Sequence, residues 1–299
     1  MLGQWHQEGN VAANLRYRPG EKRSGLWLSL PAILWLGIFF LLPLLIVLVI
    51  SFMTPARGGA QLPFTLRGYA DVFGAIYFPV VLDSVWIAFL TTLLCLLLGY
   101  PLAFFISTRK SAFLRQFTLF LVILPFWTNF LVRTYAWIGI LGNTANGTIN
   151  GLLLQTGLIQ EPLELLFTQG AVLIGLVYGF LPFMVLPIYA SVERFDFHYI
   201  EAAHDLGAND WFAFWRVVFP MTLPGVIAGC ILVFIPAIGA FVTPDLMGGT
   251  QGLMIGNLIT AQFRGSAGNW PRGAAFSMVM MAMVMISLLI YVRFGDREG

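Results

Sequence analysis

Charged residues are scarce in this 299-residue chain. They make up 10% of it, whereas soluble domains carry about 25%, and 59% of the residues are hydrophobic. The mean hydropathy is +0.83. This composition excludes an ordinary soluble fold. The formal net charge of +2 is too close to balance to indicate a nucleic-acid partner.

Lysine is almost absent, and this excludes one large class of nucleotide site. The chain contains only Lys22 and Lys110, which follow Glu21 and Arg109. A Walker A loop needs a lysine between a glycine and a serine or threonine, so the chain has no such loop of its own. If ATP drives this protein, another subunit binds it.

Cysteine and histidine are also rare, and their positions argue against a metal, haem or redox site within the membrane. Cys95 and Cys230 lie within apolar runs without Cys-x-x-Cys spacing, so we interpret both as packing residues. His6, His198 and His204 all lie outside these runs, which argues against an intramembrane haem or metal site. The spans also lack a Gly-x-Ser-x-Gly elbow, so we expect no catalytic residue of the intramembrane serine-protease type.

Long hydrophobic runs dominate the rest of the sequence. A bilayer core needs roughly 20 apolar residues in helical form, and six runs reach about that length. The first is far longer than a signal-peptide core and is expected to remain as a helix. The sequence therefore predicts an all-α membrane protein with six transmembrane helices, at about residues 26–53, 84–106, 117–141, 171–192, 219–242 and 274–292.

Lysine and arginine in the connections predict the orientation, because positively charged loops stay on the cytoplasmic side. The two ends of the chain and the second and fourth connections carry eleven of these residues, and the other connections carry four. Both termini are therefore expected to be cytoplasmic. We expect a cytoplasmic arm over residues 1–25, a transmembrane domain over 26–293 and a short cytoplasmic tail over 294–299.

The fourth connection, residues 193–218, carries the most specific pattern. The segment 199–206 is a good helix former, and Gly207 is placed to end that helix in the left-handed conformation. Asn209 is placed to cap a second helix that runs into Arg216. Two short helices of this kind on the cytoplasmic face suit a groove on a partner protein, or else rest on the membrane surface.

The spacing of this connection resembles the EAA loop of ABC-importer permeases. That pattern is EAA, three residues, Gly, nine residues, Ile, one residue and Leu-Pro; here Val217 replaces the Ile and Phe219 the Leu. The resemblance implies a type I ABC importer (MetI-like) permease fold whose EAA helix docks into a cleft on a cytoplasmic ATPase. The coupling residues that it implies are Glu201, Ala202, Ala203, Asp205, Gly207 and Pro220.

Four further segments narrow the resemblance to the spermidine/putrescine (PotB/PotH-type) permease family. They are residues 124–137, 175–193, 224–249 and 255–275, whereas residues 1–25 match nothing in that pattern. The family resemblance implies a subunit without catalytic activity or cofactor in the bacterial cytoplasmic (inner) membrane. Its implied partners are a second homologous permease, two ATPase subunits that bind ATP and Mg²⁺, a soluble polyamine-binding protein and membrane lipid.

A polyamine that crosses the bilayer needs carboxylates or aromatic faces along its path. Asp245 and Asp83, at the outer ends of the fifth and second spans, are carboxylate candidates, although each also suits a capping role. Aromatic candidates, which otherwise pack or anchor at interfaces, are Trp127, Tyr135, Tyr178, Phe234 and Phe241. Arg133, within the third span, has the wrong sign for a cation, so we expect a structural ion pair or hydrogen bonds there.

Two other functions remain open from the sequence. The same permease role could serve another small solute, because selectivity also depends on a second permease. A stand-alone secondary transporter is the other alternative, but it would leave the EAA loop unexplained.

Overall fold

A computed structural model of the chain describes residues 21–264 and 268–295. The expected N-terminal arm lies mostly outside the described residues, as does most of the short tail. The chain divides into two compact units between Val49 and Ile50. Of the helices described, five are long and apolar enough to cross a membrane, and a bent pair raises this to six.

The first unit is one long apolar helix. It begins as α1 (Glu21–Leu36), passes through the π-helical turn η3 (Gly37–Leu41) and continues as α2 (Leu42–Ser51), whose last two residues belong to the second unit. None of the most hydrophobic window within Ser29–Ser51 is buried in the protein. Such a surface suits contact with lipid or with other chains.

A short β-hairpin opens the second unit, and the all-α expectation did not include it. Strand β1 (Met53–Ala56) pairs antiparallel with β2 (Gly59–Phe64), and Ala56 lies opposite Gly59. The turn uses Gly58 with φ +73°, a conformation that glycine adopts without a steric penalty. Helix α3 (Arg67–Val72) follows and packs on the start of the last helix, α14 (Trp270–Gly295).

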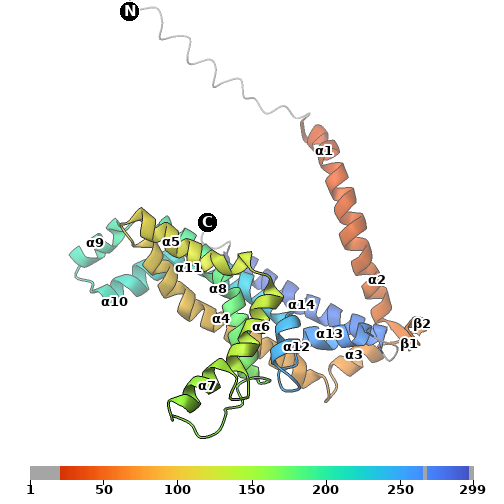
Figure 1. Cartoon of the computed structure of the whole chain (residues 1–299). Helices are drawn as coiled ribbons and strands as arrows, with labels where there is room; N and C mark the ends of the chain where they lie inside the picture. The colour runs from red at the N-terminus through yellow and green to blue at the C-terminus, as the bar shows by residue number, and fades with distance from the viewer. Residues whose placement is uncertain (1–20, 265–267, 296–299) are drawn as a thin grey trace, which may run out of the picture. The chain divides into compact units, whose positions relative to one another are not determined.

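Three long helices form the centre of the second unit (Figure 1). They are α4 (Phe78–Ser107), α8 (Gln169–Glu193) and α11 (Phe219–Ile238), and each packs against the other two. A Cβ at Gly225 would lie 2.6 Å from the carbonyl oxygen of Pro187, so this glycine allows α11 to approach α8 closely. Their shared core contains Cys95, Tyr100, Ala103, Ile106, Met184, Val185, Ile188, Val192, Val226 and Val233.

The third span differs from the continuous helix expected over residues 117–141. Helix α5 (Ala112–Ile123) leads through the 3₁₀ turn η4 (Leu124–Trp127) to α6 (Phe130–Leu141), and the two parts are bent by 96°. Pro125 lies in the first turn of η4, and Thr128 then adopts an extended conformation. Asn129 caps α6 by accepting a hydrogen bond from the Leu131 amide at 2.8 Å. An extended residue followed by an N-cap starts a new helix, and this breaks the span.

Shorter elements lie at the ends of the long helices. Helix α7 (Thr148–Gln155) stands in the connection between α6 and α8, and α12 (Val242–Met247) and α13 (Ile255–Phe263) follow α11. The fifth span therefore ends at Ile238 and not at the expected residue 242. Helix α14 packs against both α13 and α11.

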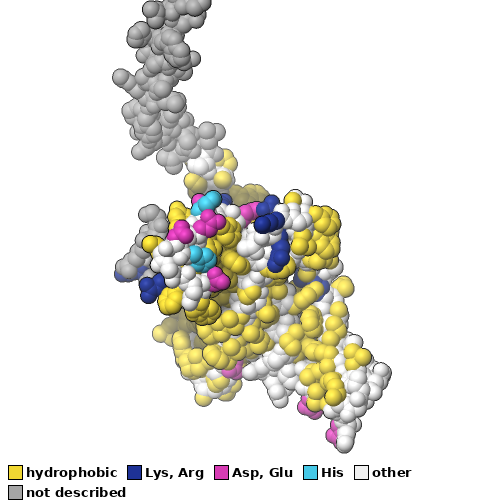
Figure 2. Space-filling view, turned by 90° about the vertical axis from the view of Figure 1, so that its left-hand side faces the viewer, with side chains coloured by type: hydrophobic (Ala, Val, Ile, Leu, Met, Phe, Trp, Pro, Cys, Tyr) yellow, Lys and Arg dark blue, Asp and Glu magenta, His cyan; other side chains and the backbone are white. Residues whose placement is uncertain are grey.

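The fourth connection forms α9 (His198–Asp205), α10 (Asp210–Ala213) and the π-helical turn η5 (Phe214–Val218). Residues Asp210 to Ile238 form one continuous helical stretch through η5 into α11. Figure 2 shows charged and histidine side chains gathered at this end, a broad hydrophobic band beyond them, and further acidic side chains at the opposite edge. This distribution suits a bilayer that surrounds the hydrophobic band.

Candidate functional site

The first half of the fourth connection ends in a Schellman motif. The Ala208 amide donates to the carbonyl oxygen of Ala203 at 3.0 Å, and the Gly207 amide donates to that of His204 at 2.8 Å. Gly207 has φ +87°, the left-handed conformation expected for it. Both predictions, a helix over about 199–206 and its termination at Gly207, are confirmed.

The second half begins with the predicted cap. The side-chain oxygen of Asn209 accepts a hydrogen bond from the Phe212 amide at 2.9 Å, which confirms its role as N-cap. A side-chain contact then joins the two short helices, because His204 Nε2 lies 3.1 Å from Asp210 Oδ1. Pro220 is the second residue of α11 and directly follows the π-helical turn η5, so the missing amide proton falls where the helical hydrogen-bond pattern is already altered.

Aromatic packing fixes this loop to the central helices. The ring of Phe214 in η5 meets Tyr100 of α4 edge to face, with centroids 5.6 Å apart. The Tyr100 hydroxyl forms a buried hydrogen bond of 2.9 Å with the Thr222 hydroxyl in α11. Ala213 is also buried. Contacts of Phe214 with α4 and with Phe219 of α11 therefore hold η5, the turn that follows α10, against the central helices.

The outward face of α9 is open. Glu201, Ala202 and Asp205 are exposed, and Leu206 retains 89% of its accessible surface. Within the described part of the chain, the Glu201 carboxylate accepts no hydrogen bond. A small apolar patch beside two free carboxylates has the chemistry of a surface that another protein covers.

A histidine–carboxylate pair stands at the start of the same helix. Asp196 Oδ1 lies 2.6 Å from His198 Nδ1 and accepts the His198 amide at 3.0 Å. The hydrogen bond that the His198 ring donates to Asp196, together with the negative charge of Asp196, raises the pKa of His198. The amide and ring hydrogen bonds from His198 in turn lower the pKa of Asp196.

Two of the aromatic pathway candidates line separate cavities. Tyr178 lies with Trp137 in an apolar cavity of about 370 Å³ between α4, α6 and α8, and their rings meet edge to face at 5.5 Å. Phe234 lines a cavity of about 570 Å³ with Trp86 and Phe89 of α4. The two predicted aromatic faces are therefore not brought together within this chain.

The other pathway candidates lie in exposed positions on different elements. Trp127 in η4 keeps 76% of its surface and Tyr135 in α6 keeps 59%. Phe241, just before α12, and Asp245 within α12 are exposed, as is Asp83 in the first turns of α4. Their part in a translocation pathway stays a prediction.

Comparison with known proteins identifies the family. Residues 96–297 match the family described as "Binding-protein-dependent transport system inner membrane component". The spermidine/putrescine transport system permease protein PotB of Haemophilus influenzae is 43% identical over 262 residues, which cover 87% of this chain and 90% of that protein. The chain belongs to this inner-membrane permease family.

Solved structures agree on the fold of the permease. A chain of a bacterial ABC transporter that imports the acidic polysaccharide alginate has a TM-score of 0.74 at 16% identity, covering 93% of this chain and 97% of that one. A chain of the alginate transporter in complex with its alginate pentasaccharide-bound periplasmic protein has a TM-score of 0.72 at 17% identity, covering 93% and 98%. The fold is that of ABC-importer permeases, as predicted.

Neither the ion pair nor the hydrogen bonds expected for Arg133 are present among the described residues. Its Nε and Nη1 atoms are buried and have no hydrogen-bond partner. The guanidinium instead lies over the Phe130 ring, with Cζ 5.6 Å from the centroid. The expectation was wrong because the central portions of the spans contain no carboxylate.

Two clusters of polar side chains in the permease were not predicted from the sequence. Arg272 Nε and Nη2 lie 2.8 and 2.7 Å from Asp71 Oδ2, and Arg272 Nη1 lies 3.3 Å from the Tyr77 hydroxyl. The fully buried Asn150 donates to the carbonyl oxygens of Gly142 and Leu163 and accepts the Leu163 amide. Asn150 lies in a turn-rich stretch, but its partners lie up to 13 residues away, so local patterns could not reveal them.

Proposed function

We propose that this permease forms half of the translocation pathway of an ATP-driven importer for polyamines such as spermidine and putrescine. The observation that carries the proposal is the 43% identity to a spermidine/putrescine permease over 87% of the chain. The EAA-type loop, folded as two short helices with an open outer face, supports an ATP-driven mechanism and not a stand-alone transporter.

The partners follow from the same reasoning. A second homologous permease completes the pathway, and two ATPase subunits bind ATP and Mg²⁺, because this chain has no Walker A loop of its own. The permease itself catalyses no reaction and holds no cofactor. A soluble binding protein delivers the polyamine from outside, as the alginate importer in complex with a periplasmic protein suggests by analogy.

The geometry of the loop suggests how force reaches the membrane. Closure of the ATPase pair would displace the exposed face of α9. The His204–Asp210 contact passes this displacement to α10, and α10 continues through η5 into α11 without a break. Since α11 packs against both α4 and α8, a push on α9 tilts the central helices and changes the side to which the pathway opens.

Uptake measurements test the proposal. Cells that carry the permease with its neighbouring ATPase, second permease and binding protein should accumulate labelled spermidine or putrescine. Cells that lack only this chain should not. A matched strain with Glu201→Lys, which reverses a charge on the exposed face of α9, should insert the permease but lose uptake. If cells without this chain took up polyamines normally, the proposal that polyamines are the transported solute would be wrong.

A non-cationic small solute is the second candidate cargo. The observation that favours it is Arg133 in the third span, which faces no carboxylate among the described residues and whose positive charge would repel a polyamine. Under this alternative, deletion of the chain would abolish uptake of another solute and leave polyamine uptake intact.

A further inference from the structure

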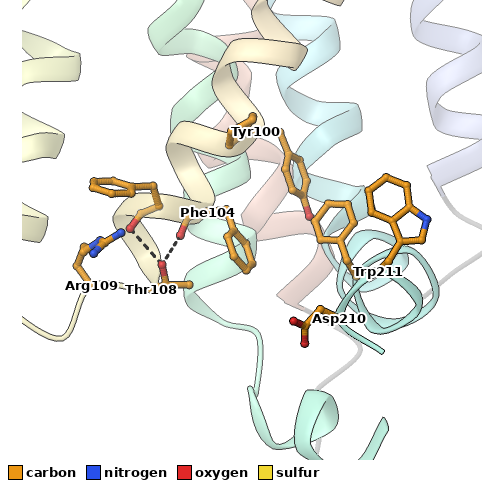
Figure 3. A pocket seen from close by; sticks show the side chains of 9 residues that line it. Tyr100, Phe104, Thr108, Arg109, Asp210 and Trp211 are labelled. Carbon is orange, nitrogen blue, oxygen red and sulfur yellow. Dashed lines mark hydrogen bonds between the residues drawn. The ribbon is translucent and has the colours of Figure 1, made fainter. Parts of the chain in front are cut away.

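A cavity of about 550 Å³ opens beside the fourth connection, residues 193–218, which we call the coupling loop after its proposed role, between the last turns of α4 and the start of α10. Its size lies within the range of small-molecule sites. Its walls are almost entirely aromatic and apolar, as Figure 3 shows, and consist of Tyr100, Pro101, Phe104, Phe105, Trp211 and Phe214.

The polar groups of this cavity lie at its rim. Arg109 stacks over Phe105 with Cζ 3.8 Å from the ring centroid, and its side chain is otherwise exposed. Asp210, on the other side of the opening, keeps 98% of its side-chain surface (Figure 3). The Thr108 hydroxyl is already used, because it donates to the carbonyl oxygens of Phe104 and Phe105. The cavity therefore combines an apolar interior with one cation and one anion at its mouth.

Residues typical of the membrane interface surround the cavity. The membrane-spanning helix α4 ends at Ser107, and Arg109 and Lys110 follow at once. On the other wall, Trp211 keeps 68% of its surface, and Trp215, one turn further, keeps 46%. Tryptophan and basic residues at the end of a span are typical of the membrane interface.

We propose that this cavity binds one phospholipid whose headgroup carries both a phosphate and a primary ammonium, as in phosphatidylethanolamine. The acyl chain fills the aromatic interior, Arg109 binds the phosphate, and Asp210 accepts hydrogen bonds from the ammonium. A purely anionic headgroup would place negative charge against Asp210. A choline headgroup has the right charges but no N–H to donate to this carboxylate.

The proposed lipid would also contact the coupling loop. Its acyl chain contacts α4 and its ammonium meets the carboxylate at the first residue of α10, which is also the residue that contacts His204. A bound lipid therefore connects α4 to α10 and restricts their relative movement. This inference concerns the permease surface and stands whichever solute is transported.

Native mass spectrometry of the detergent-purified transporter tests the site. The complex of this permease with its second permease and ATPase is titrated with phosphatidylethanolamine, phosphatidylcholine and phosphatidylglycerol of identical acyl chains. Loss of a charge-assisted hydrogen bond weakens binding by about tenfold or more. The wild type should therefore retain phosphatidylethanolamine about tenfold more tightly than either other lipid.

Variants separate this site from the general lipid shell. Arg109→Gln should lower phosphatidylethanolamine retention about tenfold, and Arg109→Lys should restore most of it. Asp210→Asn should reduce the preference over phosphatidylcholine. Phe104→Trp should fill the interior and reduce retention of all three lipids. Lys110→Gln is the matched control, because Lys110 is a neighbouring exposed cation that does not line the cavity.

Several results would overturn the proposal. One is equal retention of the three lipids by the wild type, and another is equal loss in Arg109→Gln and Lys110→Gln. Retention by the isolated permease but not by the complex would mean that a protein partner covers the cavity, and the lipid assignment would then fall.

Discussion

Replacing Gly207 with alanine should uncouple ATP hydrolysis from transport. Gly207 has φ +87°, and a Cβ added there meets no atom within 4 Å. The penalty is therefore conformational and not steric, about 1–2 kcal/mol for an L-residue in the left-handed region. That energy shifts the equilibrium between the ordered and the opened turn by a factor of about 5 to 30. Gly207→Asn should cost less, because asparagine tolerates this conformation.

The assay is uptake per ATP hydrolysed, measured in vesicles that contain the complete transporter. Gly157→Ala is a matched control, because Gly157 has φ +71° and also has no neighbour within 4 Å of an added Cβ. It follows α7, far along the chain from the coupling loop. We expect a lower coupling ratio for Gly207→Ala than for Gly207→Asn, and a normal ratio for Gly157→Ala. The reasoning fails if the two alanine variants behave alike.

Three other perturbations test the remaining contacts. Asp71→Asn should destabilise the permease by about 2 kcal/mol, because it leaves a half-buried guanidinium without its counter-charge; thermal unfolding in detergent measures this. Asn150→Leu should expose the segment after α7 to limited proteolysis, because three buried hydrogen bonds are lost. NMR titration should give His198 a pKa above its ordinary value, and Asp196→Asn should lower this pKa toward the ordinary value. The pair's stabilisation is present while His198 is protonated and Asp196 is not, so it fades as pH rises through the raised pKa of His198 and as pH falls through the lowered pKa of Asp196.

Each of these perturbations has a matched control. Asp83→Asn removes an exposed carboxylate and should leave the unfolding temperature unchanged; an equal fall in both variants would contradict the role given to Asp71. Gln155→Ala, at an exposed position at the end of α7, should not alter cleavage. Asp205→Asn, which removes an exposed carboxylate that does not contact His198, should leave the pKa of His198 unchanged; an equal change in both variants would contradict the role given to Asp196.

The long helices were predictable because their signal is local and repeated. Twenty consecutive apolar residues outweigh any single turn former, so α4, α8, α11 and α14 lie where the hydrophobic runs place them. The break in the third span was not foreseen, although its parts stand in the sequence. Pro125 indicated a kink, but a bend of 96° also needs an extended Thr128 and an Asn129 cap, and neither stands out within an apolar run.

The coupling loop was predictable for a different reason. A Schellman motif and an N-cap each depend on hydrogen bonds between residues at most five positions apart, so Gly207 and Asn209 carry their own signal. The contacts of Arg272 with Asp71 and of Tyr100 with Thr222 join residues more than 100 positions apart. Such pairs follow from the packing of whole helices, which residue patterns do not encode.

The same contrast separates coupling from translocation. The proposed coupling depends on a short segment whose hydrogen bonds close within this chain, so the chain forms this segment without a partner. The pathway candidates behave otherwise, since Tyr178 and Phe234 line different cavities and Tyr135 and Asp245 are exposed. Arg133 also holds two buried donors that this chain leaves without acceptors among the described residues. Buried donors left open in this way require acceptors from outside the described residues, and the proposed pathway shared between two permeases would supply them.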